Sequence, residues 1–487
     1  MSGKLVISTN EKYRFKVSGK LVTSTMSKNR NLMRVAKWIA PEITMAFARI
    51  VRRLIFPAQY TFGPDDPWWK KPGLGIMYQI EYRPGMDWDR DYEEFNPSMM
   101  DERGKFKFNG PFCKIENWVE LSKNVGVDYH IFESKWHDGI CYFNTKLTDW
   151  KTDMDYCGQF AEFSRHAGIP FMYYYSSVFD HNPKFDSIQP NPHSTFSDLS
   201  MDHQPMYEDY LRGHYRELMD QYHPDGMWFD WYWPDHSTKL TIDFFRTYYQ
   251  NTVITFNLSN YFPSSYDKLD YTSGEAHDFI GSYIKLVKTG SMLLPIFTGA
   301  WKWAALGRRV MDRSVELITP AGKWWQDPTL RDDPYDLVRM AAVIIGSGGK
   351  LCIGASAQLN GDIYPDQIKQ LNMLGEWYKP RKKLFTDSVP LRYRCEQVPG
   401  IKINPPSVKS IASINGRDIL VHLVNVDGVT RPIVVEFKGQ RWRNITRICV
   451  EPARKDLDLE KGNNVIKTVI RPEDNDPVDI ILRLGSN

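Results

Sequence analysis

Two carboxylates in this sequence have surroundings suited to paired chemistry. Asp230 lies in the aromatic run GMWFDWYW (226–233), and Glu275 ends the segment LDYTSGE (269–275). A buried carboxylate without partners is costly, so Asp230 either caps a helix or acts on a ligand that contacts aromatic surfaces. Glycosidic cleavage needs two carboxylates, one to attack or polarise the anomeric carbon and one to protonate the leaving oxygen. The pair favours such chemistry, with an exposed loop position as the alternative for Glu275.

Short apolar runs that alternate with helical stretches predict the strands that would position these groups. Such alternation indicates a (β/α)8-like barrel of the α/β class, with a doubly wound sheet as the alternative. Functional residues of a barrel lie at the C-terminal ends of its strands, where Asp230 and Glu275 would end the fourth and sixth. The predicted strands are 74–79, 128–134, 170–176, 226–230, 253–257, 269–275, 293–299 and 350–356.

The other predicted strand ends carry amides, aromatic residues and histidine. They are Gln79, Trp136 and His137, Tyr174 and Tyr175, Trp228, and Asn257. No glycine-rich phosphate loop follows a strand, and no GxSxG motif is present. The histidines are too scattered for an HExxH-type site, so we expect neither a metal nor a cofactor.

The chain divides into three predicted parts. Residues 1–60 form an N-terminal extension with a basic amphipathic helix, and residues 61–385 form the catalytic barrel. Residues 386–487 contain short β segments separated by turn signals, which predict a C-terminal antiparallel β-sandwich.

Composition narrows the range of partners. The 487 residues carry a net charge of +3, which gives no support to a nucleic-acid partner. The aromatic content of 14%, with 16 Trp, suits a sugar-binding cleft, although a large aromatic core is the alternative. The sequence contains no uncharged apolar stretch of about 20 residues, so we expect no membrane span. No signal peptide is recognisable, so we expect a cytoplasmic location, with export as the alternative and a homo-oligomer left open.

Several segments resemble the α-L-fucosidases of glycoside hydrolase family 29. The family builds corresponding segments around KHHDGF, around a strand ending in YYS, and around a helix that leads to Trp-x-Asp. The resemblance runs from about residue 74 to 385, and the shared order of the motifs makes it specific. The matching segments are DYEEFNP (91–97), VDYHIFESKWHDGICYFNTKLTDW (127–150), AGIPFMYYYS (167–176), YLRGHYRELMDQYHPDGMWFD (210–230) and GSGGKLCIGASAQLNGDIYPDQIKQLNMLGEWYKPR (346–381).

The resemblance implies a role for each candidate residue. Asp230 would be the nucleophile, giving retention through a covalent intermediate, and Glu275 would be the acid/base. The other residues implied in the sugar site are His137 as a ligand of hydroxyls, Trp228 as a wall, Tyr174 or Tyr175 as an aid to the nucleophile, and Trp88 as a cover for the ring.

Departures from the family pattern affect the residues that would recognise the sugar. Gln79 stands where the family has a histidine, and Trp136 replaces the first histidine of KHHDGF. No arginine occurs in NLSNYF (257–262), where the family often has one. These changes admit a related deoxysugar or a substituted fucan as substrate. They also leave two alternatives, a carbohydrate-binding pseudoenzyme of the same fold and a galactoside-type barrel glycosidase.

Overall fold

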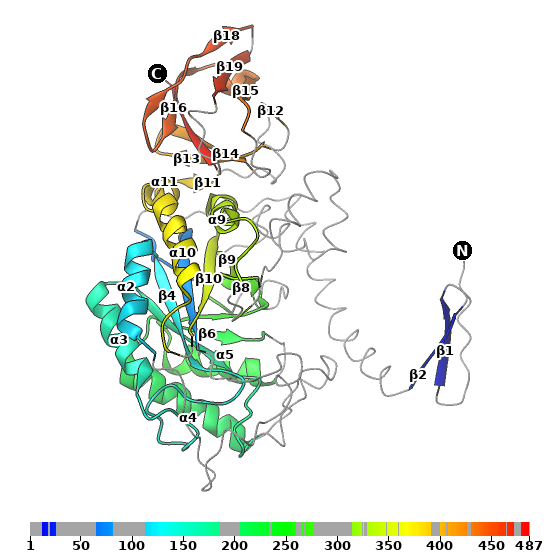
Figure 1. The fold of residues 1–487 in the computed structure, drawn as a ribbon, viewed down its shortest axis with the longest axis vertical. Coiled ribbons are helices and arrows are strands. Elements are labelled where there is room, and N and C mark those ends of the chain that lie inside the picture. The colour runs from blue at the N-terminus through cyan, green and yellow to red at the C-terminus, as the bar shows by residue number, and fades with distance from the viewer. Residues whose placement is uncertain are drawn as a thin grey trace.

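The computed structural model of the chain contains a parallel barrel followed by antiparallel sheets (Figure 1). Near the N-terminus it describes two paired antiparallel strands, β1 (Lys12–Val17) and β2 (Lys20–Thr25). The predicted helix of the N-terminal extension lies outside the described residues. Beyond β2, the structure describes residues 65–80, 113–185, 205–232, 236–259, 265, 268–275, 314–323, 325, 329–346, 348–358, 360–390, 400–405, 408–425, 430–463, 465–471 and 479–486.

Eight parallel strands form the barrel, in the order β7-β6-β5-β4-β3-β10-β9-β8. The two ends of this order come together, because Asp270 N donates to Ile254 O at 3.1 Å and Thr255 Oγ1 donates to Tyr271 O at 2.8 Å. The predicted barrel class is therefore confirmed as a nearly closed barrel. The strands are β3 (Gly73–Gln79), β4 (Tyr129–Lys135), β5 (Phe171–Ser176), β6 (Gly226–Asp230), β7 (Val253–Phe256), β8 (Thr272–Glu275), β9 (Val315–Pro320) and β10 (Lys350–Ser356).

The seventh strand differs from the prediction. The favoured run, 293–299, lies outside the described residues, and the strand between β8 and β10 is β9. Its sequence, VELITP, carries the charged Glu316 at its second position, which interrupts the apolar run that identified the other strands.

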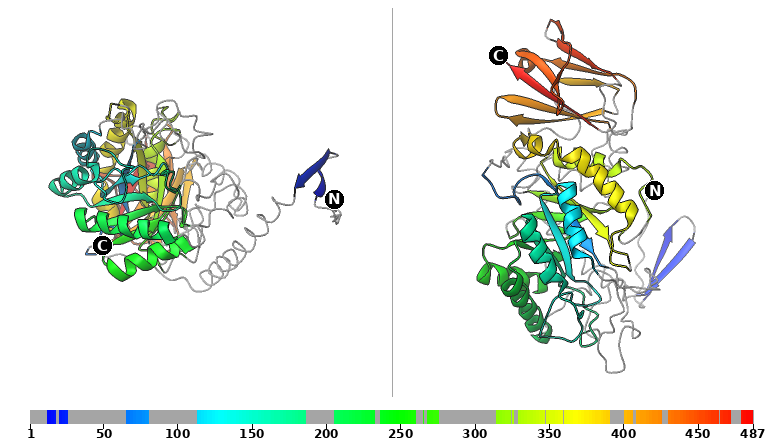
Figure 2. Two further views of the ribbon diagram at one scale, coloured as in Figure 1. Left: turned by 90° about the horizontal axis from the view of Figure 1, so that it is seen from below. Right: turned by 60° about the vertical axis from the view of Figure 1, so that its left-hand side comes forward.

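Helices cover the outside of the barrel, as the two views of Figure 2 show. The α3 helix illustrates how the sequence sets their ends: Asp155 accepts from Gly158 N at 2.9 Å at its start, and Gly168, with φ of 66°, ends it. The helices are α2 (Ile115–Val125), α3 (Tyr156–Ala167), α4 (Pro205–Tyr222), α5 (His236–Tyr248), α9 (Asp336–Gly346), α10 (Pro365–Tyr378) and α11 (Lys382–Thr386). No helix within the described residues is long and apolar enough to cross a membrane.

Strand alternation divides the side chains of the barrel into two sets. On β5, Tyr173 and Tyr175 face outward into the large core shared with the helices. Met172 and Tyr174 face inward, into a smaller cluster that includes Trp136 and Trp228. Because successive side chains of a strand point to opposite faces, only every second residue can reach the barrel interior.

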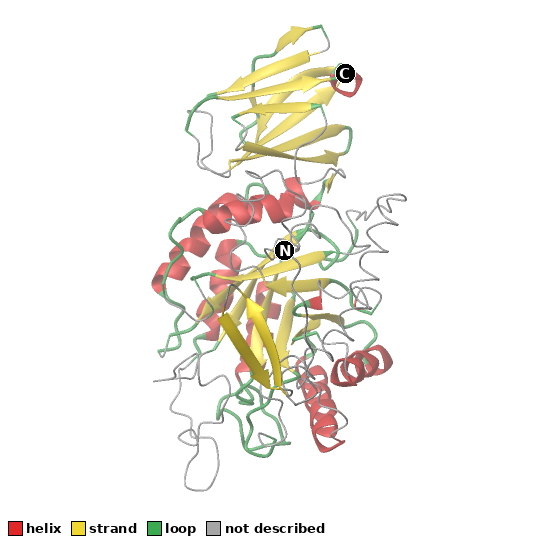
Figure 3. Ribbon diagram, turned by 90° about the vertical axis from the view of Figure 1, so that its right-hand side faces the viewer, coloured by secondary structure: helices red, strands yellow, loops and turns green. Residues whose placement is uncertain are grey.

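Two antiparallel sheets follow the barrel and share a core of aliphatic residues with Phe437 and Trp442. Figure 3 shows their strands gathered beyond the barrel. One sheet has the order β11-β13-β14-β20-β16-β17, and the other has the order β12-β15-β19-β18. Their bounds are β11 (Val389–Pro390), β12 (Ile401–Asn404), β13 (Val408–Asn415), β14 (Asp418–Asn425), β15 (Ile433–Lys438), β16 (Ile445–Glu451), β17 (Lys455–Asp456), β18 (Glu460–Gly462), β19 (Val465–Ile470) and β20 (Asp479–Ser486), with a 3-10 turn η5 (Gln440–Trp442).

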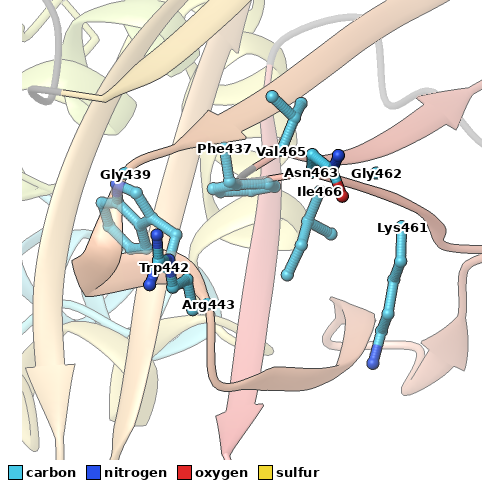
Figure 4. Close-up of a pocket in the computed structure, with 9 residues that line it drawn as sticks. All are labelled: Phe437, Gly439, Trp442, Arg443, Lys461, Gly462, Asn463, Val465 and Ile466. Atoms are coloured by element: carbon cyan, nitrogen blue, oxygen red, sulfur yellow. The ribbon is translucent and has the colours of Figure 1, made fainter.

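A groove of about 520 Å³ lies on the sandwich between η5 and the β18–β19 hairpin (Figure 4). Phe437 and Trp442 line it, but only 1% and 2% of their surface is exposed. Sugar rings stack on the exposed faces of aromatic side chains, so this groove does not offer the stacking surface of a glycan site.

Candidate active site

Asn257 links the two candidate carboxylates. It directly follows β7, and its Nδ2 donates to Asp230 Oδ1 at 2.8 Å and to Glu275 Oε1 at 2.6 Å. The two oxygens therefore lie no farther apart than the sum of these distances, about 5.4 Å. The ends of β6 and β8 thus bring Asp230 and Glu275 together, as the sequence predicted.

Backbone bonds hold Asn257 in place. Its N–H donates to Phe229 O and its carbonyl accepts from Tyr232 N, both at 2.8 Å. The sequence placed Asn257 at a strand end but gave it no role. Only its amide side chain and its place after a strand pointed to a role, because its acceptors Asp230 and Glu275 lie on strands that are distant in sequence.

The residues that follow Asp230 and Asn257 have left-handed backbones. Trp231 has φ of 59° and Leu258 has φ of 61°. In both cases the side-chain oxygen of the preceding residue accepts the N–H, at 2.9 Å from Trp231 and at 2.8 Å from Leu258. Bulky residues rarely adopt this conformation, and such strain concentrates at functional sites. Both turns fix a polar side chain at the mouth of the barrel.

Asp230 is 7% exposed and accepts hydrogen bonds on both oxygens. Tyr174 Oη donates to Oδ2 at 2.6 Å, while Asn257 and the Trp231 N–H serve Oδ1. Burial and, second, the charge of Glu275 together raise the pKa of Asp230 from 3.8 to about 7, while these three donors oppose the shift. The carboxyl group is therefore poised to change protonation near neutral pH.

His137 is a further polar side chain beside Asp230. Its Nε2 lies 3.4 Å from Asp230 Oδ2, and its Nδ1 lies 2.6 Å from Ser176 Oγ. Ser176 uses its only hydrogen on Phe179 O at 2.9 Å, so Nδ1 must be the donor to Ser176. In the neutral ring Nε2 then presents a lone pair to the carboxylate. His137 and Asp230 therefore attract each other only when a proton is bound to His137 Nε2 or to Asp230 Oδ2.

Gln79 ends β3 on the inner side and is 6% exposed. Its Oε1 accepts no hydrogen bond within the described part of the chain. Gly354 on β10 makes room beside it: a Cβ there would lie 3.3 Å from Gln79 Oε1 and 2.5 Å from the Trp325 ring. Trp325 packs on the inner cluster, and sequence reasoning gave it no role.

Trp136 and Trp228 belong to the same inner cluster. The centre of the Trp136 ring lies 4.6 Å from the centre of the His137 ring. Trp228 stacks on Tyr174 at 5.4 Å, and its Nε1 donates to Glu316 Oε1 at 2.8 Å. Both indoles therefore form part of the wall around the polar groups.

Tyr175 does not join the site. Its hydroxyl lies 2.8 Å from His214 Nδ1 on α4, and Lys135 Nζ lies 4.8 Å from the centre of its ring. Of the two tyrosines named as possible aids to the nucleophile, the structure brings Tyr174 to Asp230 and not Tyr175, because strand alternation turns Tyr175 to the other face of β5. Trp88 lies outside the described residues.

No metal site is visible in the described ranges. No group of three or more His, Cys, Asp or Glu side chains is arranged there to hold a metal ion.

Comparisons with known proteins agree with this geometry. The family model for alpha-L-fucosidase matches residues 78–278. No curated protein matches the chain.

Solved structures share the fold at low identity. The Thermotoga maritima alpha-fucosidase in complex with fucose is 17% identical, with a TM-score of 0.61, and the match covers 88% of this chain and 97% of that one. Isoenzyme 1 from Paenibacillus thiaminolyticus is 16% identical, with a TM-score of 0.61 and coverage of 86% and 98%. A Bacteroides thetaiotaomicron GH29 alpha-L-fucosidase is 15% identical, with a TM-score of 0.55 and coverage of 89% and 98%. The family model spans the strands that carry Asp230 and Glu275, which confirms the resemblance of this part of the chain to the alpha-L-fucosidase family, glycoside hydrolase family 29.

Proposed function

We propose that this chain cleaves α-L-fucosides, or a closely related deoxysugar or substituted fucan, with retention of configuration. Asp230 attacks the anomeric carbon to form a covalent glycosyl intermediate. Glu275 protonates the leaving oxygen and then activates the water that releases the sugar. The observation that carries the proposal is the Asn257 amide, which bonds both carboxylates through one nitrogen.

The spacing of the carboxylates favours retention over inversion. Retaining glycosidases have carboxyl groups about 5–5.5 Å apart, and inverting ones about 6.5–9.5 Å apart to admit a water molecule. The facing oxygens of Asp230 and Glu275 lie within about 5.4 Å. This spacing suits direct attack by Asp230.

The mechanism needs the two carboxyl groups in different protonation states. The attacking group must be ionised and the acid must carry a proton, and environments that separate two pKa values provide this. Tyr174, Asn257 and the Trp231 N–H donate to Asp230 and favour its ionised form. The burial of the pair and the charge of Glu275 oppose ionisation, so the active state is the pair with one proton.

The wall of the site suits a deoxysugar. Trp325, which is only partly buried, supplies apolar surface beside the buried rings of Trp136 and Trp228. Gln79 Oε1 offers an acceptor to a sugar hydroxyl. A buried acceptor without a donor costs about 1–3 kcal/mol, so a substrate hydroxyl placed here gains affinity. Trp88 stays a prediction as the cover of the ring.

The decisive test is a panel of aryl glycosides with product stereochemistry followed by NMR. We expect turnover of the α-L-fucoside, and the sugar first released should have the same anomeric configuration as the substrate. Asp230→Ala should lose about a thousandfold or more in kcat, since removing a nucleophile removes the covalent path. Azide should restore part of the activity of Asp230→Ala. Near-wild-type turnover by Asp230→Ala would disprove the assignment.

The replacement of two expected histidines by Gln79 and Trp136 favours a second candidate, a carbohydrate-binding pseudoenzyme. Fucoside binding by calorimetry without turnover of any glycoside in the panel would support it. Turnover of a galactoside in preference to a fucoside would instead indicate a galactoside-type barrel glycosidase.

A further inference from the structure

A buried carboxylate on β9 lies within the barrel interior and takes no direct part in the proposed chemistry. Glu316 is 0% exposed, and its Oε1 accepts from Trp228 Nε1 at 2.8 Å and from Ser273 Oγ at 2.6 Å. Its Oε2 accepts from Tyr129 Oη. These donors come from β6, β8 and β4, so one side chain ties three strands to β9 across the interior.

The bond to Trp228 leads toward the site. An indole has a single donor, its N–H, and no acceptor, so Glu316 fixes the rotation of the Trp228 ring. Trp228 and Tyr174 are register partners on β6 and β5, and their rings stack at 5.4 Å with an angle of 21° between planes. A fixed indole therefore fixes the plane of the Tyr174 ring.

Tyr174 completes the connection. Its hydroxyl donates to Asp230 Oδ2 at 2.6 Å, so its position depends on the ring that carries it. Small displacements of catalytic groups lower rates strongly, and rotamers locked by neighbouring packing prevent them.

We propose that Glu316 is a positioning residue: its carboxylate holds the Trp228 indole, which holds the Tyr174 hydroxyl on Asp230. The inference rests on the proposed role of Asp230 as nucleophile. A carboxylate buried only for stability is a weak explanation, since replacing a buried polar group and its partners by apolar residues is often neutral. Glu316 acts through geometry and does not touch the substrate.

The proposal predicts a change in a pH profile. The hydrogen bond from Tyr174 lowers the pKa of Asp230, so loosening Tyr174 should raise that pKa. The acidic limb of kcat/KM reports the free enzyme and should move to higher pH. Loss of stability alone would lower the amount of active protein without moving this limb.

The experiment compares three substitutions in the full chain. Glu316→Leu leaves the indole N–H without an acceptor, and we expect the acidic limb to rise by about half a pH unit or more, with a larger effect on kcat than on KM. Glu316→Gln keeps an oxygen for the indole, while Tyr129 Oη can accept from the new amide, so the limb should return toward that of the wild type. Ser273→Ala is the matched control, because it removes another donor to the same oxygen and leaves Trp228 bound.

Two results would overturn the proposal: an unmoved limb in folded Glu316→Leu, or an equal shift in Ser273→Ala. If Glu316→Leu does not fold, Trp228→Phe replaces it, since it keeps a ring to stack on Tyr174 and lacks the N–H. The same rise of the limb is expected, and its absence counts against the proposal.

A second readout separates this inference from the proposed function. The wild type and Glu316→Leu are each compared with the same protein that also carries Asp230→Asn. The difference in the free energy of unfolding between the two members of a pair, measured against pH, reports the pKa of Asp230 without any turnover. If the wild type turns over no glycoside, the proposed function fails, yet a higher pKa in Glu316→Leu still supports the positioning. An unchanged pKa beside normal wild-type turnover rejects the positioning alone.

Discussion

At the scale of single residues, the site depends on two like charges held close together. Asn257 donates to both carboxylates, and this neutral group cannot cancel their repulsion. The charge of Glu275 is accordingly the second cause, after burial, of the raised pKa of Asp230. The pKa of Asp230 should therefore fall when Glu275 is neutralised.

The Glu275→Gln substitution tests this coupling. With an aryl fucoside whose leaving group needs no protonation, Glu275→Gln should retain the first chemical step. The loss of the negative charge should lower the pKa of Asp230, so the acidic limb of kcat/KM should move to lower pH. An acidic limb at the wild-type position would show that the two groups do not interact.

The Asp230→Asn substitution makes a prediction about stability. The pKa of Asp230 in the folded protein, about 7, lies above its ordinary value of 3.8. Its contribution to stability is therefore fully present below about pH 4 and is lost as the pH rises toward 7. Asparagine does not titrate, so Asp230→Asn should become more stable relative to the wild type across this range, by up to about 4 kcal/mol. Urea unfolding at several pH values measures the difference, and a difference that is flat with pH contradicts the assignment.

At the scale of elements, alternation along β5 decides which tyrosine serves the site. Tyr174 donates to Asp230, while Tyr175 packs on α4 and contacts His214. The two tyrosines are neighbours in sequence but lie on opposite faces of β5. Each therefore serves as the control for the other.

We expect opposite effects when each hydroxyl is removed. Tyr174→Phe should lower kcat by about tenfold to a hundredfold, since it removes a donor to the nucleophile that lies close to the reaction. Tyr175→Phe should leave kcat unchanged and lower the free energy of unfolding by about 1 kcal/mol, because it breaks a buried hydrogen bond. Steady-state kinetics beside urea unfolding measures both. A similar loss of kcat in both variants would show that the two faces of β5 are not separate.

The same elements show how far sequence reasoning reached. Apolar runs indicated β3 to β8 and β10, and their ends brought Asp230, Glu275, His137 and Tyr174 together. The β9 strand was missed because Glu316 interrupts its apolar run, and the donors that make this burial acceptable come from other strands. The role of Asn257 was missed for the same reason. Partners that are distant in sequence do not appear in any local pattern.

At the scale of the whole molecule, the joint between barrel and sandwich is polar and buried. Asp479 at the start of β20 is 0% exposed, accepts from Trp377 Nε1 at 2.7 Å and lies 3.3 Å from Arg381 Nε. Trp377 belongs to α10, and Arg381 follows that helix. One carboxylate of the sandwich thus fixes the end of a barrel helix.

The Asp479→Ala substitution tests whether this joint holds the two parts together. It removes the acceptor of the Trp377 N–H and the carboxylate that pairs with Arg381, and breaking a buried charge pair in this way costs about 3–5 kcal/mol. We expect a lower melting temperature, with kcat unchanged below the transition, because the joint involves neither Asp230 nor Glu275. Asp456→Ala is the control, since it removes a carboxylate from a pair with Arg447 in which both side chains are 61% exposed, and it should not shift the transition. An equal shift in both variants would show that Asp479 contributes no more than a surface charge, and a fall in kcat for Asp479→Ala would show that the sandwich supports the geometry of the active site as well as its stability.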